Sequence, residues 1–433
     1  MILLLFFVVG MDRARRPPPT ASARARRGQD HHAADPPPRK RGRTDAGPSV
    51  PPPPRSPSPP SSASATSSSD SHTDRSRSPS PATAATPAGI DLDRPLTTAF
   101  PGGPSDPSLL PSFTSHVAAH IWYGSERDPL RCISHGSKIA DWPWWTREAA
   151  CSRFGQLITA SGLRPLIRDT YRSANKMVVS AFVERWHGET NTFHLPMGEM
   201  TITLDDVFCI TGIPITGSLV RSEAVDDPVR MLVDSLGVSR QEALGELGRL
   251  RGQSVRLEWL RATFSDVADE WSDLRIRQAA RAYLLYLLGC TLFTDKTGTR
   301  VSVALLRQVH DLEAVSGIAW GTSALAYLYR QLGLASRVGV RQIAGYLTIL
   351  EAWVYEHFTS FSVSRWSGWD STIPRAQRWT ERREYGSSLQ HLQASREQID
   401  DLRVDQVNSY SIISRIAICK IITNYCFNFF LIL

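Results

Sequence analysis

The chain has little cysteine and little lysine for its 433 residues. Its six cysteines are scattered, which is unlike the disulfide framework of a small secreted domain and indicates a reducing compartment. Between residues 113 and 406 only Lys138, Lys176 and Lys296 supply a primary amine. None of them lies in a glycine-rich, phosphate-cradling stretch, so the sequence offers no good Schiff-base lysine for pyridoxal phosphate.

Several motifs of common enzyme classes are also missing. The sequence contains neither a P-loop nor a dinucleotide-binding glycine pattern. It also lacks the Gly-Asp-x-His and Gly-Asn-His-Glu runs that would supply ligands to a two-metal phosphatase. We therefore expect a protein without enzymatic activity and without a cofactor.

No apolar run is long enough to cross a membrane, which takes about 20 residues. Residues 1–10 begin with nine apolar residues but lack the basic start and cleavage site of a secretory signal. We interpret them as a gene-model extension ahead of Met11; a genuine signal and an unknown role are the alternatives. The apolar stretch Tyr283–Leu288 is bounded by charged residues and predicts a buried core helix.

Proline and tryptophan divide the chain into two parts. Of the 29 prolines, 22 lie before Ser112, whereas all 12 tryptophans lie after His120. A segment poor in large apolar residues cannot bury enough surface to offset its chain entropy. We therefore predict that residues 11–112 form a disordered basic and Pro/Ser-rich arm ahead of a folded body.

The arm is basic, with ten Arg and Lys against four Asp between residues 12 and 45. Three prolines precede the cluster Arg39, Lys40, Arg41 and Arg43, which is typical of a nuclear localisation sequence. The cluster predicts a nuclear protein. Non-specific contact with nucleic-acid phosphates and a simple solvated charge run are the alternatives.

The stretch Trp186–Gly217 carries the densest set of local signals. Apolar and polar residues alternate over Met200–Leu204, which predicts a short strand or extended segment. Thr203 followed by Asp206 is typical of a helix N-cap. The helix that follows is predicted to bury Val207, Phe208 and Ile210 and to end at Gly212, ahead of Pro214.

Helical periodicity dominates the rest of the body, and no internal repeat is evident. We expect a mainly α, multi-helix globular domain with a short β-hairpin-like element near residues 192–220. The predicted helices cover residues 145–158, 176–186, 228–236, 255–264, 276–288, 320–329 and 345–358.

Two constellations are candidates for chemistry. His116, His120, Cys132 and His135 could supply four zinc ligands, but their order matches no standard zinc finger. His187 and His194 flank Glu189 and could form an acid–base pair. For both sets we favour structural roles, because polar side chains in irregular segments usually bind nearby backbone groups. The sequence thus predicts no metal site and no catalytic site.

An ordered motif within the body resembles the plant mobile domain, a family of plant transposable elements and of host proteins of the MAINTENANCE OF MERISTEMS type. A second block beginning at Trp320 and Gly321 is similar to another part of that family. The resemblance covers residues 113–406. The residues that carry the first block are Trp186, Glu189, Thr190, Phe193, His194, Pro196, Gly198, Glu199, Leu204, Asp206, Val207, Gly212 and Pro214.

The resemblance weakens near residue 374 and stops after Gln406. Family members continue with an aromatic–Pro–Tyr segment, whereas residues 407–433 are rich in Ile, Asn and Phe. We predict that the domain is truncated there and that residues 407–433 are a non-family tail translated from an intron. A cDNA that splices after Gln406 would confirm this, and one that reads through would contradict it.

The residues themselves predict a nuclear, non-enzymatic protein that does not enter a membrane. The resemblance adds a role in transposon silencing, gene-expression regulation and meristem maintenance, through protein partners such as a phosphatase-like protein. The family is often labelled aminotransferase-like, which the lysines above do not support. The alternative is a nucleic-acid-binding protein derived from a transposable element, which would use the basic arm and the residues Arg375, Arg378, Arg382 and Arg383.

Overall fold

The computed structural model describes residues 102–104, 106–146, 153–221, 223–249, 253–361, 363–379 and 389–408. All of these belong to one compact unit, residues 84–433. The predictions for residues 1–10, for the arm up to residue 101 with its cluster at Arg39–Arg43, for Arg382 and Arg383, and for residues 409–433 lie outside the described residues.

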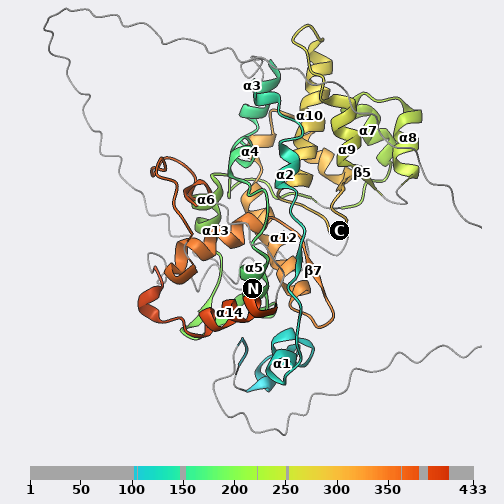
Figure 1. The fold of residues 1–433 in the computed structure, drawn as a ribbon. Helices are drawn as coiled ribbons and strands as arrows, with labels where there is room; N and C mark the ends of the chain where they lie inside the picture. The colour runs from blue at the N-terminus through green and yellow to red at the C-terminus, as the bar shows by residue number, and fades with distance from the viewer. Residues whose placement is uncertain are drawn as a thin grey trace, which may run out of the picture. The chain divides into compact units, whose positions relative to one another are not determined.

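The described part of the chain is mainly α-helical, which confirms the predicted fold class. Figure 1 labels most of the helices. They are α1 Val117–Trp122, α2 Gly136–Ile139, α3 Arg153–Ala160, α4 Pro165–Asp169, α5 Lys176–Val183, α6 Leu204–Thr211, α7 Pro228–Leu236, α8 Arg240–Gly248, α9 Leu257–Phe264, α10 Asp273–Cys290, α11 Leu306–Val309, α12 Trp320–Ala335, α13 Leu347–His357 and α14 Leu389–Asp400.

The strands are short and form three small sheets. Strands β2 (Trp186–His187), β3 (Thr192–Leu195) and β4 (Gly198–Met200) make an antiparallel sheet in which Trp186 lies opposite Phe193. The β3–β4 pair is the predicted hairpin. Two further pairs were not predicted: β1 (Arg131–Cys132) lies parallel to β7 (Gln342–Ile343), and β5 (Ser254–Arg256) lies antiparallel to β6 (Arg300–Ser302).

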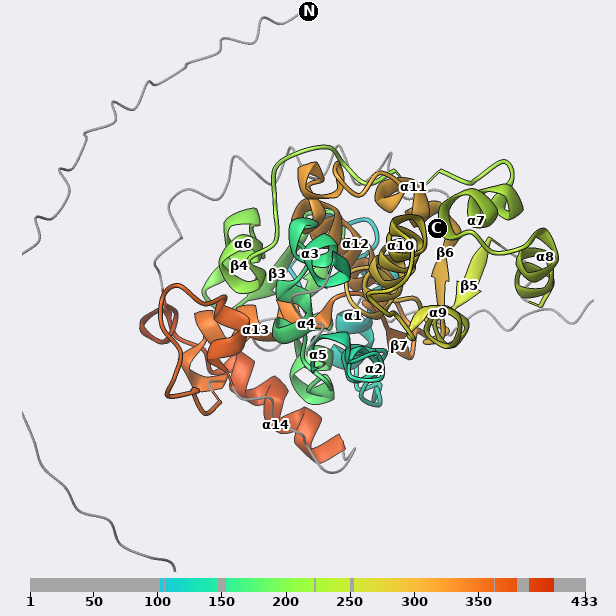
Figure 2. The same cartoon turned by 90° about the horizontal axis from the view of Figure 1, so that it is seen from above.

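The helices gather around one large apolar core. In both views α7, α8, α9 and α10 lie together on one side, while α6, α13 and α14 lie on the other (Figures 1 and 2). Helix α10 contains the predicted apolar run and is buried over most of its length, which confirms it as a core helix. Among the described helices, none combines the length and apolarity that a membrane crossing requires.

Some predicted boundaries are wrong, because pairing across the fold overrides local periodicity. The helix predicted for residues 176–186 ends at Val183, since Trp186 pairs with β3. The helix predicted for 255–264 starts at Leu257, since Ser254–Arg256 pairs with β6. The strand or extended segment predicted at Met200–Leu204 is strand only at Met200, Thr203 is still extended, and Leu204 already begins α6.

The helix predicted for residues 145–158 is also partly wrong. Trp144–Thr146 forms a 3-10 helix rather than part of an α-helix, and α3 covers Arg153–Ala160, while residues 147–152 lie outside the described residues. On α6, Val207 and Ile210 are buried as predicted. Phe208, however, is 53% exposed, because it lies on the opposite face of the helix.

Candidate functional site

Helix α6 begins and ends as the sequence predicts. The Thr203 hydroxyl accepts a hydrogen bond from the Asp206 amide, and the Asp206 carboxylate accepts one from the Thr203 amide, which is a complete capping box. Gly212 ends the helix with a φ of 67°, a left-handed conformation that favours glycine. The polar residues at this helix start therefore fix the backbone.

Asp206 has a second partner that the sequence did not suggest. His357, the last residue of α13, approaches Asp206 with its Nε2 atom 3.1 Å from Oδ1. Both side chains are buried. The pair joins the start of α6 to the end of α13, where helix dipoles favour a carboxylate and an imidazole respectively. No local pattern links residues 151 positions apart, so sequence reasoning missed it.

The two motif blocks lie against each other. The Gly321 amide donates to the Pro214 carbonyl at 2.7 Å. A Cβ atom at Gly321 would lie 2.9 Å from Ile215 and 3.1 Å from Val207, so only glycine fits there without rearrangement. Trp320 is fully buried and donates its indole N–H to the Val315 carbonyl. The start of α12 thus packs directly on α6 and the turn after it.

The motif aromatics lie in the core. The rings of Trp186 and Phe193 are 4.8 Å apart, and Trp186 also contacts the ring of Tyr329 at 4.7 Å. Phe193 stacks on Trp353 of α13 at 5.2 Å. The Tyr329 hydroxyl lies 2.6 Å from the Thr201 hydroxyl. This hydrogen bond holds the extended chain ahead of α6 in place. These residues join the small sheet to α12 and α13.

The polar residues of the β3–β4 hairpin bind one another. Glu199 accepts hydrogen bonds from His194 and from the Thr192 hydroxyl. Burial raises the pKa of Glu199, but these two hydrogen bonds outweigh it and leave the pKa below its ordinary value. The remaining motif residues occupy turns and helix positions: the Thr190 hydroxyl bonds within the loop, Pro196 is exposed at the hairpin turn, Gly198 has a φ of 119°, and Leu204 is the first residue of α6.

Two buried histidines attach the chain before α1 to the sheet. His116 and His187 stack with ring centroids 4.3 Å apart, and Phe113 contacts both rings. His116 accepts from the Ala118 amide through Nδ1, so its Nε2 donates to the Trp186 carbonyl at 2.8 Å. His187 Nε2 lies 2.8 Å from the Gly102 carbonyl. Burial and the neighbouring His187 lower the pKa of His116 to about 3, so it is neutral near pH 7.

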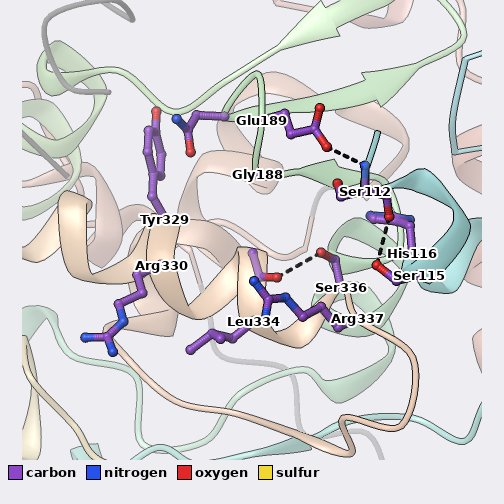
Figure 3. Close-up of a pocket in the computed structure, with 12 residues that line it drawn as sticks. Ser112, Ser115, His116, Gly188, Glu189, Tyr329, Arg330, Leu334, Ser336 and Arg337 are labelled. Carbon is purple, nitrogen blue, oxygen red and sulfur yellow. Dashed lines mark hydrogen bonds between the residues drawn. The ribbon is translucent and has the colours of Figure 1, made fainter. Parts of the chain in front are cut away.

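The loop after β2 borders a hollow, the signature pocket, with a cavity volume of about 430 Å³. Figure 3 shows Glu189 directed at Ser112, and the Glu189 carboxylate accepts a hydrogen bond from the Ser112 amide at 2.7 Å. Tyr329 and Arg330 of α12 lie across the pocket. The lining residues come from the segment before α1, the loop after β2, and the end of α12. They are Ser112, Ser115, His116, Gly188, Glu189, Asn191, Tyr329, Arg330, Gly333, Leu334, Ser336 and Arg337.

The signature pocket carries charges of both signs. Arg330 and Arg337 contribute two positive charges, and Glu189 contributes one negative charge. Gly188 faces Gly333 of α12, and a Cβ at Gly188 would lie in ordinary contact, 3.6 Å from the Gly333 Cα. Mixed charge around a hollow is suited to recognising a polypeptide segment, because such a segment offers both hydrogen-bonding and charged groups.

The rings of His187 and His194 lie 6.1 Å apart, but among the described residues neither candidate chemical constellation is assembled in full. Glu189 binds the Ser112 amide and contacts neither His187 nor His194 through a hydrogen bond. His116 is committed to backbone groups, and the Cys132 thiol faces the Leu130 carbonyl. Within the described ranges, no three His, Cys, Asp or Glu side chains are grouped so that they could hold a metal ion.

Comparisons with known proteins agree with the motif. The family model described as the plant mobile domain matches residues 163–417. Protein MAIN-LIKE 1 of Arabidopsis thaliana is 37% identical over 306 residues, 69% of this chain and 57% of that protein. Protein MAINTENANCE OF MERISTEMS of the same plant is 34% identical over 295 residues, 68% of this chain and 58% of that protein.

A Serine/threonine-protein phosphatase 7 long form homolog of Arabidopsis thaliana is 31% identical over 257 residues, 59% of this chain and 18% of that protein. The matched region thus spans little more than half of the first two relatives and under a fifth of the third. No solved structure matches the chain. The family model covers more than half of the chain and includes both motif blocks, and the chain belongs to the plant mobile domain family.

Proposed function

We propose that this chain is a nuclear, non-enzymatic protein that acts through protein partners in transposon silencing, gene-expression regulation and meristem maintenance. Family membership and the name of one relative, Protein MAINTENANCE OF MERISTEMS, support this role. The cluster Arg39–Arg43 supports entry into the nucleus.

The proposal rests mainly on the polar side chains in and around the motif, which bind other parts of the fold. Glu189, His187 and His116 bind the main chain, and Asp206 caps α6 while holding His357. A catalytic base or nucleophile needs a lone pair directed at a substrate, whereas these groups hold the fold together. The signature pocket beside them, with charges of both signs, is the feature best suited to a partner's segment.

A phosphatase-like protein is the partner class that we propose first. The family resemblance implies such a partner, and one relative of the chain carries the name Serine/threonine-protein phosphatase 7 long form homolog. Affinity purification of the tagged full chain from plant nuclei, followed by mass spectrometry, tests the proposal. We expect a phosphatase-like protein among the enriched partners, and recovery of the chain alone from nuclear extract would contradict the role.

A nucleic-acid-binding role is the second candidate, and the basic arm favours it. The body contributes less than its sequence suggests, since Arg375 and Arg378 both form ion pairs with Glu356. Binding of the full chain to duplex DNA, with an affinity that falls steeply with salt and is lost on deleting residues 12–45, would establish this role. Equal binding with and without those residues would contradict it.

A further inference from the structure

A second hollow, the Asp169 hollow, lies between the end of α4 and the segment that follows α13. Its cavity volume is about 380 Å³. The segment is held firmly: Arg375 and Arg378 pair with Glu356, the Trp379 indole donates to Glu356, and the Tyr171 hydroxyl donates to the Ala376 carbonyl. The walls of the hollow are therefore preformed.

Asp169 is the unusual residue of this hollow. It is 1% exposed, and its Oδ1 atom accepts a hydrogen bond from the Gln377 amide. Its Oδ2 atom is buried and has no hydrogen-bond partner among the described residues. Burial raises the pKa of Asp169 to about 7. Since buried polar atoms are nearly always paired, Oδ2 is an acceptor for a hydrogen-bond donor that the described residues do not supply.

Trp366 adds an exposed aromatic surface. Its side chain is 46% exposed, although its amide donates to the Arg378 carbonyl at 2.8 Å and so fixes its backbone. Gly368 packs against the indole, because a Cβ there would lie 2.7 Å from the ring. A tryptophan that is supported from the protein side and open to solvent is suited to stack against a planar ligand.

Arg168 and Arg172 give the hollow a basic rim. Arg168 also donates to the Gln377 side-chain oxygen at 3.3 Å, so it is oriented toward the hollow through the residue that binds Asp169. The two arginines would repel a metal cation or a methylated ammonium, and the Asp169 carboxylate would repel a simple anion. A ligand with a planar N–H-bearing ring and a phosphate complements the exposed Trp366 indole, the open Asp169 oxygen and the two arginines.

We propose that the Asp169 hollow binds a nucleotide, with the base stacked on Trp366, a base N–H donating to Asp169 Oδ2, and the phosphate near Arg168 and Arg172. Guanine is the base that we propose first, because its Watson–Crick edge carries N–H donors, and one of them suffices for Oδ2 while Oδ1 keeps its bond to Gln377. The site is separate from the signature pocket, and its ligand is independent of the protein partners proposed above.

Isothermal titration calorimetry of the purified full chain with guanosine 5′-monophosphate tests the proposal. We expect saturable binding that is at least tenfold weaker in Trp366→Ala and at least fivefold weaker in Asp169→Asn. Trp366 is exposed, so its variant is expected to fold even if Asp169→Asn does not. Arg168→Ala should also weaken binding, whereas its matched control Arg240→Ala, which removes an exposed arginine of α8, should leave binding unchanged.

Three results would overturn the proposal. One is the lack of saturable nucleotide binding up to millimolar concentration. Another is equal affinity for inorganic phosphate, which would mean that the arginines alone bind an anion. The third is unchanged affinity in the folded Trp366→Ala variant, which would place the nucleotide elsewhere.

Discussion

The stacked imidazoles of His116 and His187 connect the chain before α1 to the small sheet. Each ring uses a nitrogen to bind a main-chain carbonyl, which requires no positive charge. Protonating either ring would place a charge in a buried site beside the other. The attachment of this segment therefore depends on both rings staying neutral.

Acid should therefore destabilise the fold through His116. Its folded-state pKa of about 3 lies below the unfolded value near 6.5, so the unfolded chain binds more protons between these values. The contribution of neutral His116 to the free energy of unfolding is then fully present above about pH 6.5 and is lost as the pH falls below that value. We expect a loss of about 2 kcal/mol between pH 6.5 and 4.5, measured by urea denaturation.

The variant His116→Gln should lose clearly less stability over the same pH range, since glutamine does not titrate. His120→Gln is the matched control, because His120 lies only four residues away in α1 and is partly exposed. If the two variants and the unaltered chain responded equally to acid, the role of His116 would be wrong.

At the scale of elements, the contact of α12 with α6 depends on the small volume of Gly321. An added methyl group would press on the Pro214 carbonyl as well as on Ile215 and Val207. We expect Gly321→Ala to lower the free energy of unfolding by about 1–3 kcal/mol, the usual cost of overpacking. Thermal or urea unfolding measures the change.

Gly245 provides the control for this substitution. It lies inside α8, and nothing stands within 4 Å of its added Cβ. Gly245→Ala should raise stability by about 0.5–1 kcal/mol, because alanine is the better helix former. Equal effects of the two substitutions would show that helix propensity, rather than packing, determines the outcome at Gly321.

Helix α14 is attached to α5 by buried charges. Arg396 donates to both carboxylate oxygens of Glu184 at 2.8 and 2.9 Å, and Arg185 pairs with Asp400. Glu184→Gln leaves the buried Arg396 without its counter-charge, so we expect a loss of about 3 kcal/mol. Asp234→Asn breaks the exposed Arg230–Asp234 pair and should cost less than about 0.5 kcal/mol. Similar losses in urea denaturation would contradict this account.

Local signals sufficed to predict some of these elements. Helix α6 is determined by contacts a few residues apart, made by Thr203, Asp206 and Gly212. The apolar run of α10 predicts a buried helix wherever that helix lies in the fold. The β1–β7 pair could not be predicted, because it joins two-residue strands about 210 positions apart, too short to show a period. The Asp206–His357 contact and the open oxygen of Asp169 likewise depend on tertiary approach.

At the scale of the whole molecule, the arm and the body have separate predicted roles. Substituting Arg39, Lys40, Arg41 and Arg43 with alanine should abolish nuclear enrichment of a fluorescent fusion of the full chain. Substituting Arg13, Arg24, Arg26 and Arg27 removes the same charge from the same arm and should leave enrichment intact. Equal loss in both variants would mean that bulk charge, rather than the cluster, directs the protein.

Under the proposed function, the body recognises a protein partner at the signature pocket. Partner capture from plant nuclei by two charge-reversed variants of the full chain tests this recognition. One carries Arg330→Glu and Arg337→Glu in the pocket; the other carries Arg221→Glu and Arg240→Glu, two exposed arginines outside it. We predict at least fivefold lower capture for the pocket variant alone, with both variants folded by circular dichroism. Equal capture by the two would contradict the account.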